Sequence, residues 1–376
     1  MNIALVDILV LLFLVLLFIN IIMNKTRIKE PKETLLREQL PSVSVLIPTR
    51  NEAKNISACL RGVLSSDHQR YEVIVLDDQS TDNTVQIVEN IAAQSERVSL
   101  LRGRSIPPHW IGKPHAQFQA AQVSRGQYLL FLDADVILDR KALSLMCAEA
   151  KKSGAGILSL FPYQLKEGFW EGLIAPFKYF HIYLLFPTYA MDWPWEPLAA
   201  FANGQCMMIE RETYKKIGTH GTASKSIREG MTLARTLKKR GGKIRILSGA
   251  KIARAKVYGP PPALWDGLTR FLYSLAKSSA FGALMLALMY FLLFALPSAQ
   301  FAYRLFGGGD LILPAIEIAL GMIMFAVAVG EYGLAVSEIL LFPLGAFIWC
   351  MMIVRAVLFA SKKGGIVWKD RKVVIE

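Results

Sequence analysis

Two aspartates in the middle of the chain have the type and spacing of ligands for a hard metal ion. Asp133 and Asp135, separated by Ala134, directly follow Tyr128–Leu132, an apolar run typical of a strand buried on both faces. Burying two unpaired carboxylates together costs roughly several kcal/mol unless a cation neutralises them. Mg²⁺ or Mn²⁺ meets this need, because these ions take one or two carboxylates together with phosphate oxygens. The alternative is an acidic turn that caps the next helix near Arg140.

A second acidic pair follows another apolar run, in the stretch "VIVLDDQSTDNT", where Asp77 and Asp78 lie just past the predicted strand. The carboxylate of Asp78 can accept hydrogen bonds from the N–H of a nucleotide base or from ribose hydroxyl groups. The polar residues after it are of the types that cap helices. We expect them to cap the following helix rather than to bind a ligand: Ser80, Asp82 and Asn83.

The stretch "HWIGKPHA" places a lysine next to a glycine at the predicted start of a helix. Gly112 permits a tight turn, and the ammonium group of Lys113 offers a point charge to a diphosphate. We expect His109 and His115 to be structural rather than metal ligands, because no carboxylate partner lies at ligand spacing.

Alternating strands and helices must position these residues. The predicted strands are Val43–Ile47, Val73–Leu76, Val98–Leu101, Tyr128–Leu132, Ile157–Phe161 and Phe201–Ile209. The predicted helices are Ala53–Leu64, Val85–Ala93, Pro114–Val123 and Arg228–Lys239. This pattern is typical of an α/β domain with a mostly parallel sheet and flanking helices, in which ligands bind at the carboxyl ends of the strands.

The composition indicates a membrane protein. Of the 376 residues, 53% are hydrophobic, and the mean hydropathy of +0.36 is too high for an ordinary soluble enzyme. The net charge of +13 is explained by an anionic membrane surface and a phosphate-bearing substrate, since no basic stripe interleaved with aromatics indicates nucleic acid. The four cysteines show no close pairing and predict neither a zinc site nor a disulfide framework.

Apolar segments at both ends flank the middle domain, 41–256. Residues 1–24 are predicted to form a retained transmembrane anchor, and the basic residues that follow favour the cytoplasmic side: Lys25, Arg27, Lys29 and Lys32. We expect residues 257–280 to form an interfacial amphipathic segment, residues 281–360 to form two or three membrane spans, and residues 361–376 to form a basic tail. If all three apolar stretches of 281–360 crossed, this tail would lie outside, against the charge bias, so one is expected to be re-entrant or interfacial.

Six stretches together resemble glycosyltransferase family 2 with its GT-A fold: "VSVLIPTRNE", "VIVLDDQSTDNT", "WIGKPHA", "FLDADV", "FANGQCMMIERETYKKIG" and "REGMTLARTLKKRGG". The resemblance implies a nucleoside-diphosphate sugar donor, most often UDP-linked, and a divalent metal. It implies a uracil contact for Asp78 and a metal–diphosphate site at Asp133 and Asp135. We assign Pro48 and Glu52 of the first stretch, together with Lys113, to the same donor site.

A looser resemblance covers the ends of the chain as well. "HWIGKPHA", "KEGFWEGLIAPFKYF", the pair Glu229–Gly230 and the tail "GGIVWKDRKVVI" look like the 4,4'-diaponeurosporenoate glycosyltransferase branch, whose members glucosylate an apolar carotenoid acid. Hopanoid-associated and other lipid glycosyltransferases share several of these pieces.

The stretch "SIREGMTLA" departs from the wider family, most members of which place a paired acid here and use the second carboxylate as the general base. In this chain Glu229 is followed by Gly230. An acceptor that is already a carboxylate needs no base, because its pKa lies near 4 to 5. Alternatively, Glu229 is itself the base, or it is only a helix N-terminal residue that is favourable to the helix dipole.

The sequence therefore predicts a metal-dependent inverting glycosyltransferase in the cell membrane, facing the cytoplasm, that moves glucose or a similar sugar from UDP to a lipid. The stretches 169–195 and 265–281 could form the acceptor route, or they could be core packing and membrane docking. A polysaccharide synthase is disfavoured because the chain has no Q-x-x-R-W motif, and a dehydrogenase because "PTRNEAKN" contains no glycine. A catalytically inactive scaffold is disfavoured because Asp78, Lys113, Asp133 and Asp135 are all present.

Overall fold

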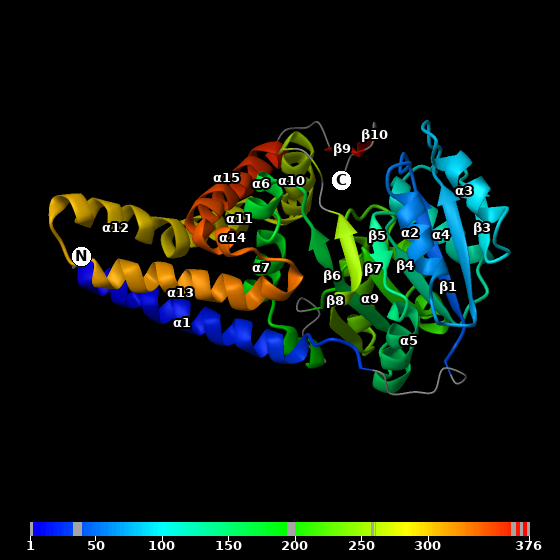
Figure 1. Ribbon diagram of the computed structural model, residues 1–376, viewed down its shortest axis with the longest axis horizontal. Coiled ribbons are helices and arrows are strands. Elements are labelled where there is room, and N and C mark those ends of the chain that lie inside the picture. The colour runs from blue at the N-terminus through cyan, green and yellow to red at the C-terminus, as the bar shows by residue number, and fades with distance from the viewer. Residues whose placement is uncertain are drawn as a thin grey trace. The chain divides into compact units, whose positions relative to one another are not determined.

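The computed structural model describes residues 3–32, 40–193, 200–256, 259, 261–361, 366–368 and 371–373 (Figure 1). The chain forms two compact units, each assembled from separate segments. The helical unit comprises Met1–Thr26, Gln164–Pro187 and Lys256–Ile366. The sheet unit comprises Arg27–Tyr163, Thr188–Ala255 and Val367–Glu376.

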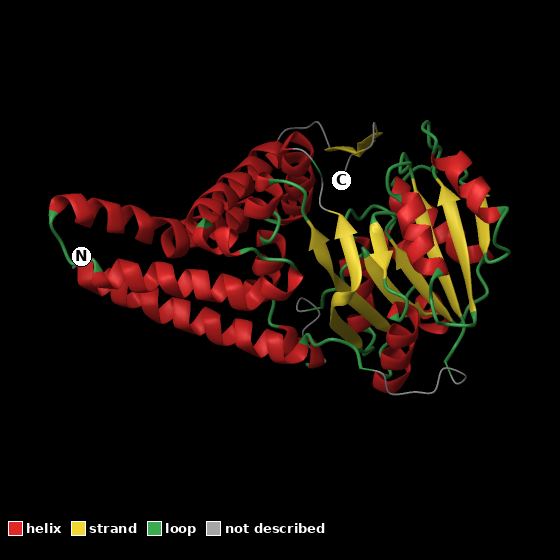
Figure 2. Ribbon diagram, in the orientation of Figure 1, coloured by secondary structure: helices red, strands yellow, loops and turns green. Residues whose placement is uncertain are grey.

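A sheet with strand order β3-β2-β1-β4-β7-β6-β8-β5 organises the sheet unit (Figure 2). Its strands are β1 (Val43–Thr49), β2 (Tyr71–Asp77), β3 (Val98–Arg102), β4 (Tyr128–Leu132), β5 (Val136–Leu138), β6 (Ile157–Leu165), β7 (Cys206–Glu210) and β8 (Ile244–Lys256). The predicted parallel pairing is found from β3 to β4, whereas β7 runs antiparallel to β4 and β6, and β5 antiparallel to β8. The α/β sheet is therefore mixed, with a parallel half and an antiparallel half.

The parallel half aligns the strand ends that carry the acidic residues. In the register of the sheet, Thr49 at the end of β1 pairs with Asp77 at the end of β2, and Leu46 pairs with Phe131 of β4. All five residues of β4 are buried, as expected for a strand covered on both faces. The loops that follow β1, β2 and β4 consequently emerge at one edge of the sheet.

The helices of the sheet unit are α2 (Ile56–Leu64), α3 (Thr84–Ala92), α4 (Gly112–Val123), α5 (Ala142–Ser153), α8 (Arg211–Lys216) and α9 (Glu229–Lys239), with short 3₁₀ turns η2 (Thr188–Asp192) and η4 (Thr219–Ala223). Of these, α2, α3, α4 and α9 lie close to their predicted positions, whereas α5 and α8 were not among the predicted helices. The strands differ from the prediction in several places, since β6 continues to Leu165 and neither β5 nor β8 was predicted. Residues 201–205 form a loop, and β7 begins only at Cys206, because Asn203, Gly204 and Gln205 interrupt the apolar run.

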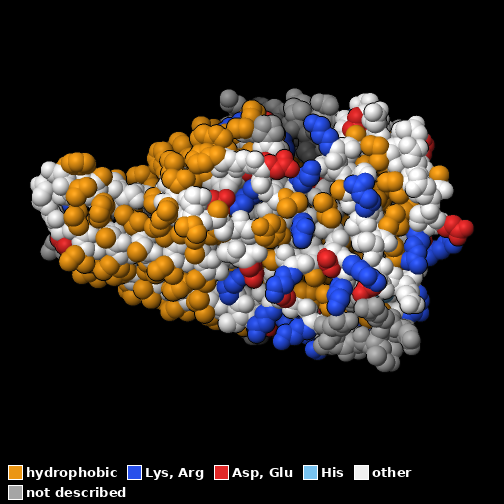
Figure 3. All heavy atoms as spheres, viewed as in Figure 1, with side chains coloured by type: hydrophobic (Ala, Val, Ile, Leu, Met, Phe, Trp, Pro, Cys, Tyr) orange, Lys and Arg blue, Asp and Glu red, His pale blue; other side chains and the backbone are white. Residues whose placement is uncertain are grey.

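The helical unit contains α1 (Ile3–Arg27), α6 (Phe169–Ile174), α7 (Phe177–Leu185), α10 (Pro261–Ser278), α11 (Ala280–Tyr290), the π-helical turn η5 (Phe291–Ala295), α12 (Leu296–Gly307), α13 (Ile312–Val329), the 3₁₀ turn η6 (Gly330–Tyr332), α14 (Val336–Leu340) and α15 (Phe342–Ser361). Among the described residues, four helical stretches are long and apolar enough to cross a membrane: Asp7–Arg27, Ala280–Gly307, Ile312–Tyr332 and Phe342–Ala360. Hydrophobic side chains cover α1, α12 and α13 on the face seen in Figure 3. Both ends of the chain thus carry membrane helices, as the composition predicts.

Polar side chains of α1 satisfy the free carbonyl groups at the end of α7. The side-chain amide of Asn24 donates to the carbonyl oxygens of Tyr183 and Phe186, at 2.8 Å each. Asn20 donates to the carbonyl oxygen of Leu184 at 3.0 Å. The last carbonyls of a helix have no partner within the helix, and leaving them unpaired in an apolar environment is costly. The anchor therefore completes the fold of the helical unit.

Aromatic packing fills the interior of this unit. Phe177 and Phe180 of α7 are fully buried and contact Phe325 of α13 and Phe342 of α15. Core packing thus accounts for the middle of the aromatic stretch 169–195. Its exposed aromatic side chains in the helical unit are Phe169 and Trp170.

Candidate active site at the carboxyl edge of the sheet

One lysine joins two carboxylates that are far apart in the sequence. Lys113, the second residue of α4, places its Nζ 2.7 Å from Oδ1 of Asp133 and 2.8 Å from Oε1 of Glu229. Asp133 follows β4, and Glu229 is the first residue of α9. The structure therefore brings together three residues that the sequence singles out for separate reasons.

Burial lowers the pKa of the Lys113 ammonium, but Asp133 and Glu229 outweigh this effect and hold the pKa above its ordinary value. Lys113 consequently stays protonated at neutral pH. The Glu229 side chain is only 5% exposed, whereas those of Lys113 and Asp133 are each 23% exposed. A helix N-terminal residue that served only the helix dipole would need no such partner, so Glu229 belongs to the charged site.

The neighbourhood of Cys59 shows where the remaining carboxylates lie. Burial raises the pKa of this thiol, and the negative charges of Asp135, Asp133 and Glu52 raise it further. The Cys59 Sγ lies 3.8 Å from the carbonyl oxygen of Asp133. The charges of three carboxylates predicted to serve the donor and metal sites therefore act on one buried thiol of α2.

The turn after β4 does not cap the next helix. The backbone N–H of Val136 donates to the carbonyl oxygen of Asp133, and β5 then separates this turn from α5. The residue before α5, Lys141, makes no side-chain cap, and Asp139 is the acid that accepts the Lys141 N–H, at 3.1 Å. The capping alternative for Asp133 and Asp135 is therefore wrong.

The chemistry of the two aspartates fits a hard divalent ion that is also bound by a substrate. Among the described residues, no three His, Cys, Asp or Glu side chains are grouped so that they could hold a metal ion by themselves. Mg²⁺ and Mn²⁺ are commonly bound by one or two carboxylates, with phosphate oxygens and water in the other positions. Asp133 and Asp135 can supply such a pair.

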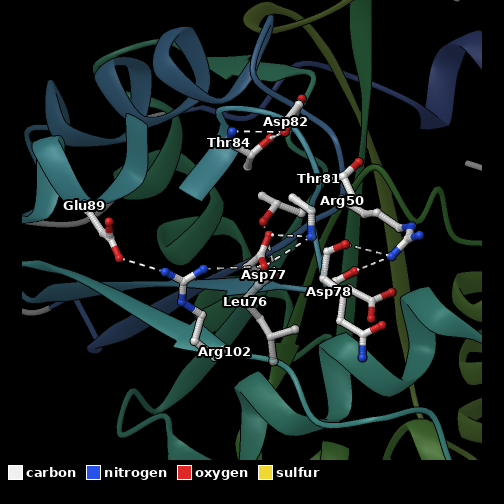
Figure 4. A network of polar contacts seen from close by, with 12 residues as sticks. Arg50, Leu76, Asp77, Asp78, Thr81, Asp82, Thr84, Glu89 and Arg102 are labelled. Atoms are coloured by element: carbon white, nitrogen blue, oxygen red, sulfur yellow. Dashed lines mark hydrogen bonds and ion pairs between the residues drawn. The ribbon is translucent and has the colours of Figure 1, made fainter. Parts of the chain in front are cut away.

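Hydrogen bonds tie the loops after β1 and β2 to each other (Figure 4). The backbone N–H of buried Asp78 donates to the carbonyl oxygen of Thr49 at 2.7 Å. Arg50 donates to the carbonyl oxygens of Asp78 and Gln79 at 2.8 and 3.0 Å. Pro48 precedes this junction in β1, opposite Leu76 of β2. Pro48 and Asp78, two of the residues predicted to bind the donor, thus lie at the same edge of the sheet.

The polar residues after Asp78 mostly connect the two loops. Ser80 Oγ accepts the N–H of Asn51 at 3.0 Å, and Asp82 Oδ2 accepts the N–H of Ala53 at 3.1 Å. Asp82 Oδ1 also accepts the N–H of Thr84, the first residue of α3, so the capping prediction holds for Asp82. It is wrong for Asn83, which occupies the N-cap position without a side-chain cap bond.

His115 is held by neighbours of its own helix. Its Nδ1 lies 3.1 Å from Nε2 of Gln119, and its ring packs on Trp110 with centroids 5.4 Å apart. Burial lowers its pKa, although the charge of Asp78 acts in the opposite direction. These contacts support the structural interpretation of His115.

Two glycines allow α9 to approach the loop 201–205, a contact that the sequence analysis missed. A Cβ at Gly230 would lie 3.0 Å from the carbonyl oxygen of Ala202 and 3.1 Å from the backbone nitrogen of Gly204. A Cβ at Gly204 would lie 2.8 Å from Oε1 of Glu229. Packing thus explains why a glycine follows Glu229. The sequence signal was the pair of short motifs "ANG" and "EG".

His220 is a second residue that the sequence analysis missed. Its Nδ1 lies 2.7 Å from the hydroxyl of Tyr214, and that hydroxyl accepts the His220 backbone N–H at 3.1 Å. The side chain is fully buried against Phe131 of β4. Burial, followed by the nearby charge of Lys113, lowers its pKa to about 3, so the ring is neutral. No spacing in the sequence connects "THG" with Lys113.

Comparisons with known proteins agree with this architecture. Residues 44–218 match the family model for glycosyl transferase family 2. The solved structure of the mannosyltransferase PcManGT from Pyrobaculum calidifontis, in complex with GDP-Man and Mn²⁺, superimposes with a TM-score of 0.57 at 18% identity. The match covers 95% of this chain and all of that one, and at this identity the likeness concerns the fold.

Two curated relatives carry the same name. The 4,4'-diaponeurosporenoate glycosyltransferase of Staphylococcus haemolyticus is 34% identical over 143 residues, which is 38% of this chain and 37% of the relative. That of Staphylococcus aureus (strain bovine RF122 / ET3-1) is 30% identical over 195 residues, which is 51% of this chain and 50% of the relative. The chain thus matches between about a third and a half of the length of these relatives.

The chain therefore has a GT-A-like fold, together with helices long and apolar enough to cross a membrane among its described residues. Its middle part, residues 44–218, resembles a glycosyl transferase family 2 domain.

Proposed function

We propose that the protein is an inverting glycosyltransferase that transfers a hexose, glucose in the first instance, from a UDP-sugar to a lipid acid. The observation that carries the proposal is the bridge from Lys113 to Asp133 and Glu229, which links the acidic donor site to the start of α9. The match to the family 2 model supports the transfer of a sugar. The curated relatives are named 4,4'-diaponeurosporenoate glycosyltransferase, after a carotenoid acid, and this name supports the acceptor class.

The donor would lie across the carboxyl ends of β1, β2 and β4. Pro48, Glu52 and Asp78 would hold the nucleoside, with Asp78 accepting from the uracil N–H. Asp133 and Asp135 would hold Mg²⁺ or Mn²⁺, which neutralises diphosphate charge when it is bound. The Pyrobaculum calidifontis mannosyltransferase was solved with Mn²⁺ and a GDP-sugar, so GDP-mannose is the competing donor to test.

Lys113 would stabilise the leaving group. In an inverting displacement the acceptor oxygen bonds to the anomeric carbon while the bond from that carbon to the diphosphate breaks. The electron pair of the broken bond remains on the diphosphate oxygen. An ammonium group held in place before the reaction stabilises this developing charge without reorganisation. The two carboxylates that hold Lys113 would provide that fixed position.

Glu229 has a different role for each acceptor class. A carboxylic acid arrives ionised above about pH 5, so Glu229 would only position Lys113. A lipid hydroxyl such as that of a hopanoid or glycerolipid would need a base, and Glu229 is the carboxylate available beside the lysine. This second acceptor class is the competing function.

Product chemistry distinguishes the two acceptors. We would incubate the full chain in lipid nanodiscs with UDP-glucose or GDP-mannose and two matched acceptors, a C30 polyene carboxylic acid and the corresponding alcohol. Transfer to the acid gives a glycosyl ester, which mild alkali cleaves, whereas transfer to the alcohol gives an alkali-stable glycoside. We expect the alkali-labile product from UDP-glucose, detected by mass spectrometry.

The Glu229→Gln variant is the internal control of this experiment. Its transfer rate to the acid should fall by less than the ~100-fold expected for loss of a general base. A loss of several hundredfold, with a wild-type pH profile that rises near pH 6 to 7, would identify Glu229 as the base and the acceptor as a hydroxyl. An alkali-stable product alone would lead to the same revision.

We also propose that the sheet unit faces the cytoplasm. The basic residues at and after the end of α1 support this orientation, because basic segments that flank a span stay on the cytoplasmic side. Lys25 at the end of α1 pairs with Glu331, just past α13, at 2.8 Å, which places the ends of these two helices at the same level.

A further inference from the structure

The helix α15 carries an arginine whose partners lie on the amphipathic helix α10. The Arg355 guanidinium donates to Oγ1 of Thr269 at 2.9 Å and to Oδ1 of Asp266 at 3.1 Å. It also lies 5.8 Å from the ring centre of Trp265. The Asp266 side chain is 60% exposed, so this ion pair reaches the surface of the helical unit. Such a pair is costly at the centre of a bilayer and favourable at its headgroup level.

Arg355 also shortens the apolar part of α15. The uncharged run before it, Phe342–Val354, has a length of about 20 Å at 1.5 Å per residue, so α15 could cross a hydrocarbon core of roughly 30 Å only with Arg355 inside that core. Apolar runs of about 10–14 residues are found in buried core helices and in re-entrant or interfacial segments.

An ion pair also joins the region just before α15 to a residue close to the point where the chain passes from the sheet unit into the helical unit. Glu338 of α14, just before α15, pairs with Lys166 at 2.5 Å. Lys166 lies two residues after the chain enters the helical unit at Gln164, and Asp266 lies ten residues after it re-enters at Lys256. The ion pairs near both ends of α15 thus involve residues that lie soon after the chain enters the helical unit, at Gln164 and at Lys256.

An apolar stripe runs along the free face of α15. Its residues recur every three or four positions and are 39–60% exposed: Leu344, Phe347, Met351, Val354 and Leu358. The other face is occupied, since Phe342 and Trp349 stack on Phe177. The stripe continues past Arg355 as far as Leu358, as expected for a helix whose exposed side rests on acyl chains along its whole length.

We propose that α15 does not cross the membrane. On this view α10 and α15 form a two-helix layer in the headgroup region of one leaflet, which is the cytoplasmic leaflet in the orientation proposed above, with the apolar stripe in the acyl chains of that leaflet. The proposal rests on the membrane attachment proposed above. It leaves three membrane crossings, formed by α1, α11–α12 and α13. The basic tail 361–376, most of which lies outside the described residues, is then on the cytoplasmic side, as the charge bias requires.

Cysteine labelling tests the side of the membrane. The four native cysteines are buried and can remain. Single cysteines would replace Ala360 near the end of α15, Lys251 in the sheet unit and Asp310 between α12 and α13. Each full-length variant would be treated with an impermeant maleimide in vesicles of both orientations. We expect Ala360→Cys to react from the same side as Lys251→Cys and from the opposite side to Asp310→Cys.

The labelling pattern of the three cysteines tests the inference about α15 independently of the proposed cytoplasmic orientation. If Lys251→Cys and Ala360→Cys both react from the outside, the cytoplasmic orientation is wrong and the inference about α15 stands. If Ala360→Cys reacts with Asp310→Cys from one side and Lys251→Cys from the other, α15 crosses and the inference is overturned.

Depth measurements provide a second readout that does not depend on reactivity at Ala360. Spin labels at Leu344, Met351 and Leu358, which span about 21 Å of helix, would be compared by their collision with oxygen and with a polar nickel chelate. An interfacial helix places all three at one depth within a few ångströms. Labels at Ile316 and Ile323 of α13, both exposed, are the matched control and should differ in depth by up to about 10 Å. A depth profile in which Met351 lies deepest, with Leu344 and Leu358 near opposite surfaces of the bilayer, would overturn the proposal.

Discussion

Replacing Lys113 with methionine should destabilise the sheet unit strongly. The variant leaves Glu229, with a side chain 5% exposed, and Asp133, 23% exposed, without the ammonium group that now lies within 2.8 Å of both. Removing one partner of a buried ion pair costs about 3–5 kcal/mol. For a domain of this size 1 kcal/mol corresponds to about 2–4 °C, so the melting temperature should fall by about 6–20 °C.

A thiol-reactive dye can follow this transition in the full chain. Cys59, Cys147 and Cys206 are buried in the sheet unit, and a Cys350→Ala background removes the buried thiol of the helical unit. Lys215→Met is the matched control, because Lys215 pairs with Glu212 on the surface with both side chains more than half exposed. Its effect should stay below about 1 kcal/mol.

A double-mutant cycle tests whether the bridge causes the effect. In Lys113→Met/Glu229→Gln the second substitution removes the more deeply buried unpaired charge, so the double variant should be more stable than the sum of the single changes predicts, by about 1–3 kcal/mol. Additivity within ~0.5 kcal/mol, or a Lys113→Met variant that melts within 2 °C of the wild type, would refute this reasoning.

Further predictions concern neighbouring features. Gly230→Ala should lower both the transfer rate and the melting temperature, because its Cβ would lie 3.0 Å from a backbone oxygen. Gly230→Asp should lower the transfer rate further only if its charge repels an anionic acceptor, which rate measurements on both variants would show. Asp135→Asn should abolish transfer and weaken UDP-sugar binding, and full wild-type activity in excess EDTA would contradict the metal site. His220→Gln should flatten the pH dependence of melting. Burial lowers the His220 pKa to about 3, so below about pH 6.5 only the unfolded state binds the proton, and the wild type loses about 1.4 kcal/mol of stability per pH unit. Equal slopes of stability against pH in the wild type and the variant would rule this out. Asn24→Ala should destabilise the helical unit by about 1–3 kcal/mol for each orphaned carbonyl, seen as earlier labelling of Cys350, and unchanged labelling would argue against the cap.

The parallel half of the sheet could be predicted because its strands are apolar runs that end in polar loops. Tyr128–Leu132 is buried at every position and ends at Asp133, as the sequence indicates. The antiparallel half was harder to predict. β8 is long and carries basic residues, and the boundary of β7 depends on the loop 201–205, whose conformation is determined by its contact with α9.

The candidate site could be predicted residue by residue but not as an arrangement. Lys113, Asp133 and Glu229 are separated by 20 and 96 positions in the sequence, and no periodicity relates them. His220 and Gly204 join the site only through the tertiary packing of η4 and of the loop 201–205. The aromatic residues of α7 were ambiguous for a similar reason, since only the folded chain shows that they pack on α13 and α15.

The asparagine contacts between α1 and α7 have a consequence for how the chain is made. Asn24 is bonded to carbonyl groups 159 and 162 residues further along the chain, and Asp7 pairs with Arg304, 297 residues further along. At about 5–20 residues per second of synthesis, the first helix waits roughly 8–30 s for α7 and about 15–60 s for α12. During that interval its amide and carboxylate groups have neither partner, and the whole sheet unit up to Tyr163 emerges from the ribosome in between. The helical unit of this protein therefore cannot be completed before the sheet unit has largely been synthesised.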